Sequence, residues 1–127
     1  MRVALDTNAY RAAAEGDAKT VEILRRAEDV RLPFVVLGEL RAGFAAGTKG
    51  RRNEAKLTEF LNSPRVSITY ADEQTTHHYA ALFAELRRQG APIPTNDLWI
   101  AALVVQHDLL LLSGDAHFAK IPRIVRL

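Results

Sequence analysis

The amino-acid sequence predicts an α/β protein whose largely parallel sheet is covered by helices on both faces. Short apolar runs alternate with helical patterns along the chain, which is typical of strand–helix–strand units. One of these runs, residues 109–112, is wholly apolar, as a strand buried on both faces should be. The 127 residues contain no repeat, linker or low-complexity tract, so we expect one domain over residues 1–127.

Two strands and two helices are predicted in the first part of the chain. Residues 2–5 form a short apolar run that stops at a polar turn, as a buried strand does. Helices are expected over 8–14 and 18–28, separated by a glycine–aspartate break, and the second has an apolar face. A second strand over 30–32 ends at Pro33.

The middle of the chain is predicted to be mostly helical. Apolar residues recur about every 3.6 positions over 34–47, and a polar helix follows over 51–61. An Asn-Ser-Pro break then leads to a strand over 66–68. A long amphipathic helix over 72–89 is expected to be capped by Asp72 or by the threonine three residues later.

The last part of the chain is predicted to hold one more long helix and two strands. Residues 91–94 are too rich in proline for a regular element, so they form a loop. The helix over 96–107 that follows is apolar almost all round. After the strand over 109–112 we expect a short turn of helix at 116–119 and a last strand at 124–125.

The composition excludes several classes of protein. No cysteine is present, which rules out disulfide scaffolds, zinc–thiolate sites, iron–sulfur clusters and cysteine nucleophiles. The first residues lack the apolar stretch of a signal peptide, and no segment approaches the length that spans a bilayer. We therefore expect a cytoplasmic protein without a membrane partner. The net charge is only +2, but the sequence pI is about 9.2. If four of the 15 acids bind metal, 11 remain against 17 lysines and arginines, and so basic a surface suits a phosphate-backbone partner, although many unrelated proteins are equally basic.

Four acidic residues stand out by their positions. Asp6 follows the first predicted strand, Asp97 opens a predicted helix, and Asp115 comes shortly after a strand. Because ligands bind parallel sheets at the carboxyl ends of the strands, these three positions can converge. Glu39 lies in an otherwise apolar helix, where a charged residue must find a partner or face solvent.

A cluster of four carboxylates would need a cation. Carboxylates within several ångströms of one another repel, and each raises the pKa of the others unless a cation neutralises them. Magnesium takes oxygen ligands and usually keeps several waters, which leaves room for phosphate. Two such ions activate water and stabilise the leaving oxygen in phosphodiester hydrolysis. Each aspartate also has a simpler explanation, since Asp is a common helix cap and a favourable neighbour of helix N-termini.

Small polar residues flank these acids. The candidates for holding the carboxylates and metal-bound water in position are Thr7, Asn8, Thr95, Asn96 and Ser113, although all five are also ordinary turn and cap residues. His117 lies two residues after Asp115 and could approach the site, although we expect a capping or surface role for it.

Four short motifs carry a resemblance to a known family. They are Leu5-Asp6-Thr7-Asn8, Leu37-Gly38-Glu39-Leu40-Arg41-Ala42-Gly43, Asn96-Asp97-Leu98-Trp99-Ile100-Ala101-Ala102 and Ser113-Gly114-Asp115-Ala116-His117-Phe118. In this order they resemble the PIN-domain family, and most closely its VapC toxin branch. Each motif is weak alone, but the four together extend over essentially the whole chain.

The resemblance implies a fold, an activity and partners. The fold is a three-layer α/β/α sandwich, and the activity is that of a Mg²⁺- or Mn²⁺-dependent endoribonuclease. Carried over position by position, its catalytic and metal-binding acids are Asp6, Glu39, Asp97 and Asp115, none of which is substituted here. The partners are an RNA substrate, a second copy of the chain, and a cognate antitoxin whose tail blocks the active site. Neither the RNA nor the bond that is cut follows from the motifs.

Basic residues suggest a path for RNA beside the acids. The cluster after the Glu39 segment consists of Arg41, Lys49, Arg51, Arg52 and Lys56, and Arg87 and Arg88 end the long helix. These residues could follow phosphates, although such a run is usually a solvated face. Trp99 and Phe118 are expected in the core and not as platforms for stacking bases.

Other functions stay open at this point. An Asp at the end of the first strand also begins haloacid-dehalogenase-type phosphatases, but these need a second Asp where this chain has Asn8. A PIN-like nuclease with a housekeeping role in RNA processing, or a non-catalytic module that docks a basic tail in an acidic pocket, would share the same residues. Our hypothesis is metal-assisted hydrolysis without a covalent nucleophile.

Overall fold

The computed structural model describes residues 1–127 and confirms an α/β fold with a parallel sheet. Strands and helices follow one another along the chain. The elements are β1 (Arg2–Leu5), α1 (Thr7–Ala14), α2 (Ala18–Arg26), β2 (Asp29–Pro33), α3 (Phe34–Ala46), α4 (Gly50–Leu61), β3 (Val66–Thr69), α5 (Glu73–Arg88), α6 (Thr95–His107), β4 (Leu110–Leu112) and the 3₁₀ helix η1 (Ala116–Lys120).

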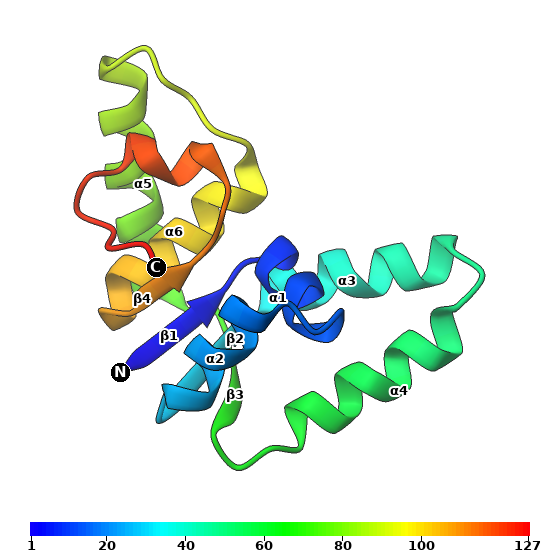
Figure 1. Ribbon diagram of the computed structural model, residues 1–127. Coiled ribbons are helices and arrows are strands. Elements are labelled where there is room, and N and C mark those ends of the chain that lie inside the picture. Colours follow the sequence, from blue (N-terminus) through cyan, green and yellow to red (C-terminus); the bar gives the residue numbers. More distant parts are fainter.

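The four strands form one sheet in the order β3-β2-β1-β4, and all neighbours are parallel. The chain first adds β2 and β3 on one side of β1 and then returns to place β4 on the other side. Because crossovers between parallel strands are right-handed, this reversal puts α5 and α6 on the opposite face from α1 and α2. Figure 1 shows these two helix pairs on different sides of β1. The result is the predicted three-layer arrangement.

The central strand β1 is wholly enclosed after its first residue. Val3, Ala4 and Leu5 have no exposed surface, and they belong to a core cluster of 26 buried residues. Helix α6 is the most buried helix, with a run from Ile100 to Val104 in which no residue is more than 1% exposed. This burial fixes the ends of β1 and α6, where two of the predicted acids lie.

Helix α3 follows β2 without a loop and lies at the carboxyl edge of the sheet. It contacts both α1 and α6, so it connects the two helix layers at that edge. Figure 1 shows α3 and α4 as a helical hairpin that projects away from β4 and the α5–α6 pair. Glu39 is therefore carried on a helix that faces the ends of β1 and β4.

The last predicted strand and the cap of α5 differ in form from their predictions. The last strand, expected at 124–125, does not form, because the chain beyond Pro122 pairs with β4 only through a single parallel bridge between Leu111 and Arg126. The alternative caps of α5 are both present, since Asp72 and Thr75 form a reciprocal capping box. No helix of the structure combines the length and the apolar character that crossing a membrane requires.

Candidate metal centre

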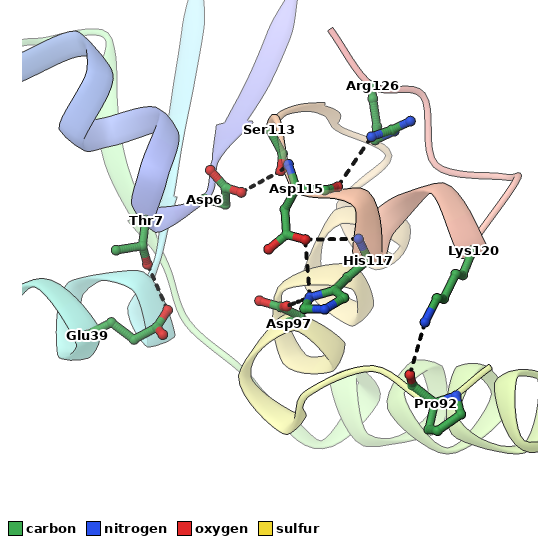
Figure 2. Close-up of polar contacts among 10 residues, drawn as sticks. All are labelled: Asp6, Thr7, Glu39, Pro92, Asp97, Ser113, Asp115, His117, Lys120 and Arg126. Carbon is green, nitrogen blue, oxygen red and sulfur yellow. Dashed lines mark hydrogen bonds and ion pairs between the residues drawn. The ribbon is translucent and has the colours of Figure 1, made fainter.

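The four predicted acids line one cleft at the carboxyl edge of the sheet. It has a volume of about 370 Å³, and its walls come from α1, α3, α6 and the segment after β4. Figure 2 shows Asp6, Asp97 and Asp115 close together, with Glu39 facing them from α3. The cleft lies between β1 and β4, where the strand order reverses, which is the place where open α/β sheets bind ligands.

Asp6 and Asp115 are tied together by Ser113. Asp6 directly follows β1, is only 4% exposed, and caps α1 by accepting a hydrogen bond of 2.8 Å from the Ala9 amide. The Ser113 hydroxyl donates to Asp6 Oδ2, and Ser113 Oγ accepts from the Asp115 amide at 3.0 Å. The cap explanation for Asp6 is thus correct, but capping uses only one of its two carboxylate oxygens.

His117 contacts two of the acids, so the prediction of a capping or surface role was wrong. Its Nδ1 lies 2.7 Å from Asp97 Oδ2 and 3.1 Å from Asp115 Oδ1 (Figure 2). Its backbone amide also donates to Asp115 Oδ1 at 2.9 Å. Asp97, Asp115 and His117 each offer a ligand atom, and these atoms lie within 4.8 Å of one another, close enough to share a metal ion.

Glu39 is held on the other side of the cleft. Its Oε1 accepts a hydrogen bond of 2.7 Å from the Thr7 hydroxyl at the start of α1. The side chain is half-buried, so the single acid of this mostly apolar helix has both a hydrogen-bond partner and access to the cleft. The sequence argument that Glu39 must find a partner or face solvent is confirmed on both counts.

Burial and mutual repulsion raise the pKa of two acids. For Asp6 the main cause is burial, reinforced by the charges of Asp115 and Asp97 and opposed by the hydrogen bonds from Ser113 and Ala9. For Asp97 burial again raises the pKa most, the hydrogen bond with His117 lowers it, and Asp115 raises it further. No lysine or arginine forms an ion pair with any of the four acids. The cleft therefore carries negative charge that no ion pair with lysine or arginine neutralises.

The other predicted site residues lie at different distances from the acids. Asn8 is exposed and lines the cleft, and Ser113 is in direct contact with two acids. Thr95 lines a separate cavity between α5 and the loop before α6, and it forms no hydrogen bond with an acid. The structure does not bring Thr95 to the site.

The basic residues predicted to follow RNA are not part of the cleft. Arg41 forms an ion pair with Glu54, with 2.8 Å between Nε and Oε1. Arg51 and Arg52 are exposed at the start of α4 and do not line the acidic cleft. Of the aromatic residues, Phe118 is buried as predicted, whereas Trp99 is half-buried and stacks on Tyr79 with ring centroids 4.0 Å apart.

The sequence analysis missed one cleft residue as a site candidate, since Arg11 lines the cleft. Thr7 was among the small polar residues expected to hold an acid, and it donates to Glu39. The available signal for Arg11 was helical spacing, because it lies four residues after Thr7 and three after Asn8 and so neighbours both on the surface of α1.

Together, a parallel sheet with unneutralised acids at its switch point is the arrangement of a divalent-cation site in an α/β protein. Residues 3–124 match the PIN domain, and the chain belongs to that family. The resemblance inferred from the four motifs is thereby confirmed.

Several VapC proteins are similar to this chain. Ribonuclease VapC4 of Mycobacterium tuberculosis is 31% identical over 90 residues, which span 71% of this chain and 69% of that protein. Ribonuclease VapC1 of Haemophilus influenzae is 32% identical over 84 residues, which span 66% of this chain and 61% of that protein. The crystal structure of VapBC2 from Rickettsia felis bound to a DNA fragment from their promoter matches with a TM-score of 0.87 and 28% identity, covering 100% of this chain and 98% of that chain.

Proposed function

We propose that this chain is a divalent-metal-dependent endoribonuclease and the toxin of a type II toxin–antitoxin pair. The proposal rests chiefly on the convergence of Asp6, Glu39, Asp97 and Asp115 in one cleft where no arginine or lysine is paired with them. The similar proteins named as ribonucleases support the choice of RNA as the substrate. We include a cytoplasmic location in the proposal, since RNA is the intended target.

The donor atoms of the cleft fit Mg²⁺ or Mn²⁺. Carboxylate oxygens are the hard ligands that these ions prefer, and Asp6 and Asp97 have pKa values raised by burial and by neighbouring acids, which a bound cation would reverse. Asp6, Asp97, Asp115 and Glu39 would hold the metal, and His117 lies within reach of the same position. A metal bound there would supply Lewis-acid activation of the phosphate and of water.

The residues of the chain itself would orient the reaction. Ser113 fixes the Asp6 carboxylate relative to the Asp115 segment, and His117 fixes Asp97. Thr7 keeps Glu39 on the opposite wall, so the acids remain separated by a space in which an RNA phosphate can lie. Acids held in this way from four elements need no reorganisation when substrate binds, and such preorganisation is a large part of catalysis.

Cleavage of RNA by the purified chain tests the proposal. We expect cleavage with Mg²⁺ or Mn²⁺, and its loss in EDTA and in Asp6→Asn and Asp97→Asn. Asp72→Asn is a matched control, because Asp72 bonds to Gln106 at the far end of α6 from Asp97. Undiminished cleavage in chelator, or in both cleft variants, would refute the enzymatic function.

The toxin role and the partners need separate measurements. The cleft is acidic, so we propose that a basic antitoxin tail occupies it, and the Rickettsia felis structure is of a toxin–antitoxin pair. Expression of the chain should arrest bacterial growth, and co-expression of the antitoxin should restore it, whereas harmless expression of an active nuclease would leave a housekeeping role. We also propose a homodimer, which light scattering of the purified chain would measure.

A further inference from the structure

We propose that Arg11 and Lys56 form a phosphate-binding site outside the metal centre, which holds a neighbouring part of the RNA backbone. This inference rests on the proposed function and extends it to substrate positioning. It concerns a polar groove between α1, α3 and α4, which we call the Arg11 groove. The groove has a volume of about 280 Å³ and is lined by Tyr10, Arg11, Ala14, Glu15, Leu40, Gly43, Phe44, Asn53 and Lys56.

The Arg11 groove is adjacent to the acidic cleft. Arg11 lines both cavities, so its side chain connects them. Besides the buried Tyr10 of α1, the other polar donors of the groove are Asn53 and Lys56, which come from α4. A strand of RNA with one phosphate among the acids would therefore find Arg11 next, and then the donors of α4.

Arg11 lies against a glycine of α3. A Cβ at Gly43 would be 3.4 Å from Arg11 Nη2, so the guanidinium lies close to the backbone of α3. Because α1 packs on α3, this contact positions Arg11 without an ion pair.

Neither cation of the Arg11 groove is neutralised by the protein. Arg11 and Lys56 are exposed, and neither forms an ion pair, even though Glu15 lies in the same groove. Arg41 on the neighbouring face is different, because Glu54 takes its guanidinium at both Nε and Nη2. Unpaired guanidinium and ammonium groups beside amide donors are the usual partners of backbone phosphates. Of the residues predicted to follow RNA, Lys56 therefore has a free charge in this groove and Arg41 does not, and Arg11 adds a contact that the sequence analysis did not predict.

The salt dependence of RNA binding tests this site. Each lysine or arginine that neutralises a phosphate releases counterions, so log K falls with log salt by about 0.7 for each contact with a single strand. We expect Arg11→Ala and Lys56→Ala each to reduce the slope by about 0.7, and the double variant by about 1.4. The probe is a labelled single-stranded RNA of mixed sequence, measured by fluorescence anisotropy with Mg²⁺ in an Asp97→Asn background, which the proposed function predicts to be inactive.

Two control variants distinguish a phosphate contact from a general effect. Arg26→Ala removes an exposed cation whose partner is Glu22, at the end of α2 away from the cleft, and it should leave the slope unchanged. Arg11→Lys keeps a charge and should retain most of the slope. A role in folding alone would lower the unfolding temperature without changing the slope.

The outcomes separate this inference from the proposed function. If the wild-type chain cleaves RNA but Arg11→Ala and Lys56→Ala leave the salt slope of RNA binding unchanged in the Asp97→Asn background, the Arg11 groove is refuted and the nuclease stands. If the wild-type chain cleaves no RNA, the proposed function fails, whereas a reduced slope in these variants would still support the groove. An unchanged slope together with weaker inhibition by the antitoxin would assign the groove to the protein partner and overturn the proposal.

Discussion

Aspartates at the two ends of the central strands have opposite surroundings. At the amino end of β2, Asp29 accepts from Arg31 Nε at 2.8 Å and from Arg2 Nε at 3.4 Å, and these arginines, Arg31 above all, hold its pKa below the usual value. At the carboxyl end of β1, Asp6 has no arginine or lysine partner, and burial raises its pKa. An aspartate is thus paired with arginines at one end of the sheet, whereas at the other end it has hydrogen bonds but no cationic partner.

This difference supports the proposal that the functional site lies at the carboxyl end of the sheet. Arginines beside Asp29 show that this fold can neutralise an acid when only stability is needed. The four acids of the cleft have no such partners, and burial raises the pKa of Asp6 and of Asp97. Carboxylates with perturbed pKa values in a cleft are a frequent mark of a functional site. Replacing an aspartate with asparagine at each end of the sheet tests this difference.

The largest contrast should appear in RNA cleavage. Asp115→Asn keeps an oxygen that can accept from the His117 amide but loses a charge in the cleft, and we expect it to lower kcat/KM about a thousandfold, the several kcal/mol that a catalytic metal contributes. Asp29→Asn should cleave RNA at the wild-type rate. The measurement is the initial rate with saturating Mg²⁺ or Mn²⁺. Equal losses in both variants would show that charge at either end matters only for folding.

Stabilisation of the fold by metal should depend on the acids at the carboxyl end of the sheet and not on Asp29. A ligand that binds only the folded state at 100 times its Kd adds about 2.7 kcal/mol. For a chain of this size we expect Mn²⁺ at that ratio to raise the unfolding temperature by about 5–10 °C. Asp29→Asn should show the same increase, and Asp115→Asn little or none. Calorimetry with and without EDTA measures it, and an increase of equal size in Asp115→Asn would place the metal elsewhere.

The sequence was enough to predict the acids because strand ends are a local signal. Apolar runs locate β1 and β4, and in a parallel sheet their carboxyl ends share one edge, so Asp6 and Asp115 follow directly. Thr95 could have been set aside by the same reasoning. It is two residues from Asp97 on a helix, and residues at that spacing do not share a face.

What the sequence did not predict depends on packing between elements. Arg41 pairs with Glu54 only because α3 and α4 form a hairpin, and no local pattern gives the angle of that hairpin. His117 reaches Asp97 across 20 residues of chain because η1 lies against α6. The predicted strand at 124–125 is reduced to one bridge, since only Arg126 is in register with Leu111.

Removing the contact between Ser113 and two acids should have the next largest effect on metal affinity and activity. Ser113→Ala removes the hydroxyl that donates to Asp6 and accepts from the Asp115 amide. Loss of a residue that orients metal ligands typically costs about 10–100-fold in metal affinity or activity, and we expect a decrease in that range. Titration with Mn²⁺ followed by calorimetry separates this from a folding defect. A variant with normal metal affinity and rate would make Ser113 merely a turn residue.

Neutralising Asp6 should stabilise the metal-free protein. Asn at this position can still cap α1 and bond to Ser113, but it removes a buried charge. We expect Asp6→Asn in EDTA at pH 7 to gain about 1 kcal/mol, as substitutions that relieve active-site strain commonly do. Because folding raises the pKa of Asp6, the wild-type penalty is absent below the usual value of 3.8 and grows as pH rises through the folded pKa. Denaturant unfolding at several pH values should show this gain disappear in acid.

Neutralising Asp29 should lower the free energy of unfolding, and this is the smallest effect that we expect. Its side chain is 27% exposed, so the two arginine pairs together should contribute at most about 1 kcal/mol, which Asp29→Asn would lose. Because these arginines lower the pKa of Asp29, its contribution is present above the usual value of 3.8 and is lost as pH falls through the folded pKa. As the pH falls, therefore, the free energy of unfolding of both variants should approach that of the wild type. That of Asp6→Asn should start above the wild-type value, and that of Asp29→Asn below it. Two variants that shift stability in the same direction at pH 7 would mean that the two ends of the sheet are not electrostatically different.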